Sequence, residues 1–166
     1  MNAIHRVLSS THLNEGQKLA VHYFVVSLVL LGAQIVFGLI AGLQYLHPDT
    51  LYGKLDFNVN RMVHINAMVV WMLYGFIGTV YWLLEEESEH PIVGLGIGKL
   101  FFWILTVAVG IVVVVYLLVQ VGPGEESTLW LINEGREYLE APRWADIGIV
   151  LSVLVFFFNV ASTFAK

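Results

Sequence analysis

Residues 62–84, MVHINAMVVWMLYGFIGTVYWLL, contain no Asp, Glu, Lys or Arg. Three further stretches share this property, namely 19–48, 100–124 and 147–165. A helix needs about 20 mostly apolar residues to cross the hydrocarbon core of a bilayer, so each stretch qualifies. Lipid offers no partner to an unpaired backbone amide, and these continuous runs lack the alternation of a barrel strand. The sequence therefore predicts an all-α integral membrane protein with four transmembrane helices.

The composition of the chain agrees with this fold class. Of its 166 residues, 58% are hydrophobic and 13% are charged, against about 25% charged residues in an ordinary soluble domain. This balance excludes a soluble globular enzyme, a nucleic-acid binder and a disordered protein. The chain has no cysteine, which excludes disulfides, thiolate nucleophiles, iron–sulfur ligation and covalent haem attachment. Any metal must be bound by histidine nitrogen or by oxygen ligands.

We expect residues 1–166 to form a single membrane domain. The first apolar run is far longer than the roughly 7–15 residues of a signal-peptide core, so we interpret it as a permanent span. A polar tail at 1–18 precedes it, and the acidic runs 85–89 and 125–126 are interpreted as solvated loop. The expected spans are 19–46, 62–84, 98–121 and 145–165.

Four spans place both termini on one face of the membrane and the loops 47–61 and 122–144 on the other. Orientation should follow the Lys and Arg bias of the loops. The terminal face has Arg6, Lys18, Lys99 and Lys166, and the other face has Lys54, Arg61, Arg136 and Arg143. The charges divide equally, so this rule does not decide the orientation.

Pairs of glycines in the apolar runs indicate close helix packing. Gly38 and Gly42 form a G-x-x-x-G pattern in the first span, and Gly75 and Gly78 lie one turn apart in the second. Small residues let helix backbones approach one another in lipid. We interpret all four as packing positions, which implies neighbouring helices.

His64 is the most informative polar residue. Among six histidines, His22 and His64 are the two inside apolar spans, where polar residues are costly and point to function. Arg61 lies one helical turn before His64 and shares its face. A neutral imidazole beside a fixed cation suits a haem, because the nitrogen can ligate iron and the guanidinium can pair with a propionate. The alternative is a histidine bonded to a carbonyl near the interface, with Arg61 extended to the headgroups.

No second haem ligand is evident in the sequence. His22 is expected at the other end of the first span, roughly 30 Å from the level of His64 at 1.5 Å per residue. His47 is on the correct side but precedes Pro48 at a helix end, which makes it a poor rigid ligand. A six-coordinate haem at His64 therefore needs a ligand from elsewhere.

The segment 135–144, GREYLEAPRW, carries two carboxylates. Glu137 and Glu140 are three residues apart, so on a helical turn they face the same way. Together they could ligate a hard cation such as Ca²⁺, or carry protons. Arg136 and Arg143 could instead neutralise them in a structural ion-pair cluster, which is the better interpretation of so short a motif taken alone.

Taken together, these segments resemble the large, haem b-containing subunit of bacterial nitric oxide reductases. The likeness covers 17–165 and is closer to the cytochrome c-dependent type, since the extra N-terminal helix and soluble domain of the quinol-dependent type are missing. The matching stretches are NVNRMVHIN (58–66), VWMLYGFIG (70–78), the acidic run 85–89, GREYLEAP (135–142), FFFNV (156–160), QKLA (17–20) and GLQY (42–45).

The resemblance implies the N-terminal four-helix portion of a fold of about twelve helices, that of the haem-copper oxidase superfamily. It also implies an enzyme of the bacterial inner membrane that reduces two NO to N₂O and water with two electrons and two protons. The termini would then be cytoplasmic and the loops 47–61 and 122–144 periplasmic.

The resemblance also implies roles for four residues. His64 would be one axial ligand of a low-spin haem b, with Arg61 near its propionates. Glu137 would ligate a calcium ion that bridges the propionates of the two b-type haems. Glu140 would be a buried acid that takes part in proton delivery.

Several ligands of that family are not found in this sequence. They are the second axial histidine, the proximal histidine of the high-spin haem b, and the His and Glu ligands of the non-haem iron. We therefore expect the chain to be inert alone, as a fragment, a truncated product or one piece of a split subunit. Its expected partners are the remaining helices and a small membrane-anchored cytochrome c subunit. The alternatives are a non-catalytic membrane scaffold or assembly subunit that binds no haem, and part of another haem-copper relative that reduces O₂.

Overall fold

The computed structural model describes residues 13–51, 53–119 and 142–166. Within these residues the secondary structure is helical, with no strand, and each helix is long and apolar enough to cross a membrane. This confirms the all-α fold class with four membrane-spanning helices. The helices are α2 (Glu15–Leu46), α3 (Phe57–Ser88), α4 (Leu95–Val119) and α5 (Arg143–Phe164).

The helices extend past the apolar windows at several ends. α2 begins at Glu15 because Asn14 forms a capping box: its side chain accepts a hydrogen bond from the Gln17 backbone N–H, and the Gln17 side chain accepts one from the Asn14 N–H. α3 continues to Ser88, so the expectation of a loop across 85–89 was wrong, and only Glu89 leaves the helix, in a left-handed conformation. The second acidic run, 125–126, lies outside the described residues.

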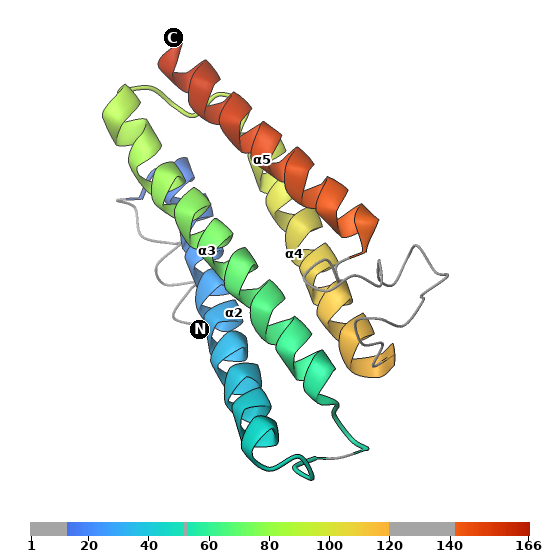
Figure 1. The fold of residues 1–166 in the computed structure, drawn as a ribbon. Coiled ribbons are helices and arrows are strands. Elements are labelled where there is room, and N and C mark those ends of the chain that lie inside the picture. Colours follow the sequence, from blue (N-terminus) through green and yellow to red (C-terminus); the bar gives the residue numbers. More distant parts are fainter. Residues whose placement is uncertain (1–12, 52, 120–141) are drawn as a thin grey trace, which may run out of the picture.

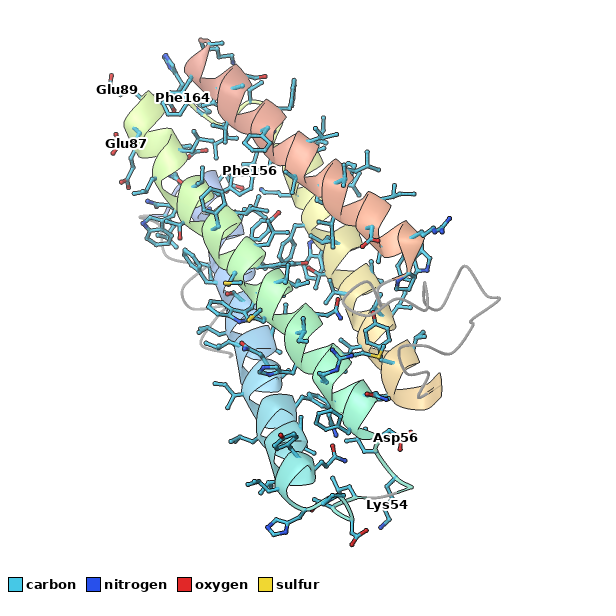
Figure 2. All side chains as sticks on the ribbon, viewed as in Figure 1. Lys54, Asp56, Glu87, Glu89, Phe156 and Phe164 are labelled. Atoms are coloured by element: carbon cyan, nitrogen blue, oxygen red, sulfur yellow. The ribbon has the colours of Figure 1, made fainter. Side chains whose placement is uncertain are left out.

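The four helices form two antiparallel pairs, α2 with α3 and α4 with α5 (Figure 1). The start of α2, the end of α3 and the start of α4 meet at one end. There the Lys99 ammonium donates to Glu15 Oε2 at 2.6 Å, and the Gln17 amide donates to Glu86 Oε1 at 2.6 Å. Figure 2 shows Glu87 and Glu89 at this end of α3, with Lys54 and Asp56 at the opposite end.

Glycines allow α2 and α3 to approach closely, as the sequence predicts for Gly75 and Gly78. A Cβ added at Gly78 would lie 2.9 Å from Cβ of Tyr23, and one at Gly75 would lie 3.3 Å from Ser27 Oγ. Gly42 has no such contact among the described residues, since an added Cβ there would meet nothing within 4 Å, so its packing role stays a prediction. The close contacts between the two helices therefore depend on particular glycines rather than on the whole pattern.

A buried polar cluster fixes α5 to the rest of the bundle. Asn159 of α5 accepts a hydrogen bond from the Tyr81 hydroxyl of α3 at 2.6 Å and donates one to the Val93 carbonyl at 2.7 Å. The Val93 N–H donates to the Thr163 hydroxyl, which in turn donates to the Asn159 carbonyl. Gly98 leaves room for the cluster, since a Cβ there would lie 2.9 Å from both Asn159 Oδ1 and Tyr81 Oη.

At the other end of the bundle, Gln44 fixes the connection between α2 and α3. Its side-chain amide donates to the carbonyls of Thr50 at 3.1 Å and Leu55 at 2.6 Å. Its oxygen accepts a hydrogen bond from the fully buried Asn60 side chain at 2.6 Å. Because Asn60 is in the first turn of α3, Gln44 sets where that helix begins relative to α2.

We expect Gln44→Ala to lower the free energy of unfolding by about 1–2 kcal/mol, because the Asn60 amide loses its buried partner while the two carbonyls lie near an exposed turn that water can reach. The measurement is the melting temperature of the membrane protein in detergent. Leu46→Ala, at a residue that is 71% exposed, serves as the control. Equal stability of the two variants would contradict this role for Gln44.

Candidate functional site

The His64 side chain extends from α3 to the backbone of α2. Its Nδ1 lies 2.8 Å from the Gln34 carbonyl oxygen, and within the described residues this is the one hydrogen bond of the ring. A carbonyl can only accept, so Nδ1 carries the proton and, in the neutral ring, Nε2 keeps its lone pair. The structure therefore selects a tautomer in which Nε2 is available to bind a metal.

The imidazole lies directly on the backbone of α2 at Gly38. A Cβ added at Gly38 would be 2.5 Å from Nδ1 and 2.6 Å from Cε1 of His64, closer than carbon atoms approach such a ring. Gly38 is one turn after Gln34, so the glycine and the carbonyl together form a seat for the imidazole. Gly38 is thus a contact of His64 rather than a general packing position.

Gln34 is held from a second point on α3. The Trp71 indole N–H donates to Gln34 Oε1 at 2.6 Å, and the Ser27 hydroxyl donates to the Trp71 carbonyl at 2.8 Å. α3 therefore binds α2 around Gln34 twice, through His64 to the backbone and through Trp71 to the side chain. These contacts set the rotation of the two helices about their axes at the level of His64.

Arg61 lies one turn before His64 on α3 and is half-buried. Its neighbours Met62 and Val63 are almost fully buried against Val112 and Tyr116 of α4. The first turns of α3 are thus packed on two sides, against α2 and against α4. This packing holds the stretch that carries Arg61 and His64 in a defined orientation.

The other two histidines considered as ligands do not approach His64. His22 Nδ1 contacts the Lys18 carbonyl at 2.8 Å, and its ring packs edge-on against Phe102. His64 pairs with Gln34, twelve residues from His22 along α2, so the two levels are about 18 Å apart at 1.5 Å per residue. The expected separation of roughly 30 Å was too long, although the two histidines still cannot share one iron. His47 ends α2 as an exposed C-cap residue.

The described residues contain no group of three or more His, Asp or Glu side chains that could hold a metal ion. A metal at His64 would accordingly need its further ligands from a cofactor or from outside the described residues. The second candidate site cannot be placed, because Glu137 and Glu140 lie outside the described residues, as does Arg136.

Three residues of this site were not predicted from the sequence. Gln34 and Trp71 were not assigned a role there, and Gly38 was assigned only to packing. A polar Gln34 inside an apolar span was the available signal, and Gly38 follows it by one turn. The pairing with His64 could not be inferred from the sequence, because it depends on the register between two helices.

Two comparisons with known proteins bear on this arrangement. A family model described as "Cytochrome C and Quinol oxidase polypeptide I" matches residues 18–166. A nitric oxide reductase subunit of Stutzerimonas stutzeri is 40% identical over 154 residues, which cover 92% of this chain and 32% of that protein. The chain therefore spans about a third of the length of this curated relative.

Proposed function

Because the chain belongs to the cytochrome c and quinol oxidase polypeptide I family, we propose that it works as part of a nitric oxide reductase. The reaction of that enzyme would be the reduction of two NO to N₂O and water with two electrons and two protons. The 40% identity to a nitric oxide reductase subunit supports this substrate over O₂. The described residues would contribute to the reaction through a haem site.

The observation that carries the proposal is the environment of His64. Histidines that ligate metals almost always donate their other ring N–H to a carbonyl, a carboxylate or water, which fixes the tautomer and raises the basicity of the ligating nitrogen. The bond from His64 Nδ1 to the Gln34 carbonyl has this form. We therefore assign His64 as a residue whose Nε2 would hold the iron of a low-spin haem b, a group that would supply electron transfer to the reaction.

Arg61 completes this part of the proposal. A guanidinium one turn from the ligand, on the same helix, is suited to pair with a haem propionate. Its position toward the start of α3 places it near the end of the bundle that carries the Lys54 and Asp56 side chains (Figure 2).

The remaining parts of the proposal rest on the resemblance of 135–142 and on the family. Glu137 would ligate a calcium ion between the haem propionates, and Glu140 would take part in proton delivery. Other helices would supply the second axial ligand, the high-spin haem b and the non-haem iron, and a small membrane-anchored cytochrome c subunit would deliver electrons. The assembly would lie in the bacterial inner membrane, with the N-terminus of this chain in the cytoplasm.

The proposal is tested by deleting the gene for this chain in its native host. The rate of N₂O formation from NO is then measured in membranes isolated from that strain. We expect N₂O formation to fall to the background rate and to return when the wild-type chain is supplied. Leu154→Ala, at a position that is 57% exposed on α5, should restore the rate as well as the wild type does. Formation of N₂O at the original rate without the chain would contradict the proposal.

A further inference from the structure

The imidazole of His64 occupies the space that a side chain at Gly38 would need, so a side chain there requires the imidazole to move. An added Cβ would lie 2.5 Å from Nδ1 of His64, whereas ordinary van der Waals contact begins at 3.4 Å. The displacement is about 1 Å and is directed away from α2, on whose surface the Gln34 carbonyl also lies. It would stretch the 2.8 Å bond from Nδ1 to that carbonyl beyond the usual hydrogen-bond range of about 2.7–3.2 Å.

We infer that Gly38 is a positioning residue for the His64 ligand. By lacking a side chain, it lets the imidazole reach the Gln34 carbonyl, which fixes Nδ1 as the protonated nitrogen and leaves Nε2 with its lone pair. This inference rests on the proposed function for the identity of what Nε2 binds. The geometric part, that the imidazole and a Cβ at position 38 exclude one another, stands on the structure alone.

Loss of the contact between His64 and the Gln34 carbonyl would change the reduction potential of a haem bound at His64 in a defined direction. A hydrogen bond donated from Nδ1 to a carbonyl makes Nε2 a stronger donor to iron. A stronger donor stabilises the oxidised iron, so loss of the bond raises the reduction potential of the haem. Small errors in ligand placement, of the order of 1 Å, are sufficient to weaken a metal site.

Gly42 provides a matched control on the same helix. It belongs to the same G-x-x-x-G pattern and lies one turn after Gly38, yet a Cβ at Gly42 would meet no atom of the described residues within 4 Å. Gly38→Ala and Gly42→Ala raise helix propensity equally. They differ in whether the new methyl group meets the imidazole.

The first experiment compares both alanine variants in the complex purified from native membranes. For Gly38→Ala we expect a several-fold loss of low-spin haem b per chain or, where haem is retained, a higher midpoint potential and altered electron paramagnetic resonance g-values. Gly42→Ala should match the wild type in each measurement. A Gly38→Ala complex with the wild-type spectrum, potential and g-values would overturn the inference.

The second experiment needs no haem signal and covers the case in which Gly38→Ala fails to accumulate. The melting temperature and the amount of chain in the membrane are measured for Gly38→Ala, His64→Ala and the double variant. We expect Gly38→Ala to lower the melting temperature when His64 is present and to leave it unchanged in the His64→Ala background. The double variant should therefore have the melting temperature of His64→Ala. Additive losses would contradict a direct clash.

The two outcomes separate the inference from the function on which it rests. If His64→Ala keeps the low-spin haem, the haem assignment fails while the coupling between positions 38 and 64 can still be measured. If His64→Ala loses the haem but Gly38→Ala behaves like Gly42→Ala, the assignment stands and the positioning role fails.

Discussion

His64→Ala is expected to remove the low-spin haem b signal from the complex, leaving less than about a tenth of the wild-type absorbance per chain. The reason is that, on the proposed assignment, the alanine takes away the iron ligand, whose imidazole bonds to the Gln34 carbonyl and lies against Gly38. The measurement is the reduced-minus-oxidised visible spectrum of complexes purified in parallel. If the proposed function holds, N₂O formation by the complex should fall with it.

His22→Ala is the matched control for this prediction. His22 is the second histidine within an apolar helix, and its ring nitrogen also contacts a carbonyl, that of Lys18. It lies about 18 Å along α2 from the level of His64, by the helical rise of 1.5 Å per residue. The haem signal should survive His22→Ala. Retention of the signal in His64→Ala would favour a scaffold subunit that binds no haem through this residue.

Asn159→Leu is expected to cause the second large effect, a loss of about 2–6 kcal/mol in the free energy of unfolding. The substitution leaves the Tyr81 hydroxyl and the Val93 carbonyl, which Asn159 now satisfies, without their buried partner, at about 1–3 kcal/mol for each group. The measurement is the melting temperature of the purified complex, together with the amount of chain in the membrane.

Two further variants show whether this loss has the assigned cause. Tyr81→Phe removes one bond of the cluster and should give part of the loss. Leu154→Ala, on the exposed face of the same helix, should change the melting temperature little. An Asn159→Leu protein as stable as Leu154→Ala would contradict the role of the polar cluster in fixing α5.

The fold class could be predicted because lipid leaves few alternatives. Apolar runs of this length must form helices in a bilayer, and the four windows correspond to α2, α3, α4 and α5. The helix ends were less predictable, because they depend on local hydrogen bonds. The capping box of Asn14 with Gln17 starts α2 inside the polar tail, and the glutamates after Leu84 continue α3 because nothing breaks the helix before Glu89.

For the candidate site, the sequence could indicate His64 but not the residues around it. His64 could be singled out because an ionisable side chain in an apolar span is costly. Its seat combines residues 30 positions apart in the chain, and that pairing follows from the rotation and register of α2 against α3. For the same reason Gly38 and Gly42 are equivalent in the sequence, while only Gly38 meets the imidazole.

The most direct test of the haem assignment is the dithionite-reduced-minus-oxidised visible spectrum of this chain, isolated from its native membranes in mild detergent with whatever chains accompany it. We predict a low-spin b-type haem signal that purifies with the chain and with further membrane polypeptides. A preparation that contains those polypeptides and gives no haem signal would contradict the assignment of His64 as an iron ligand.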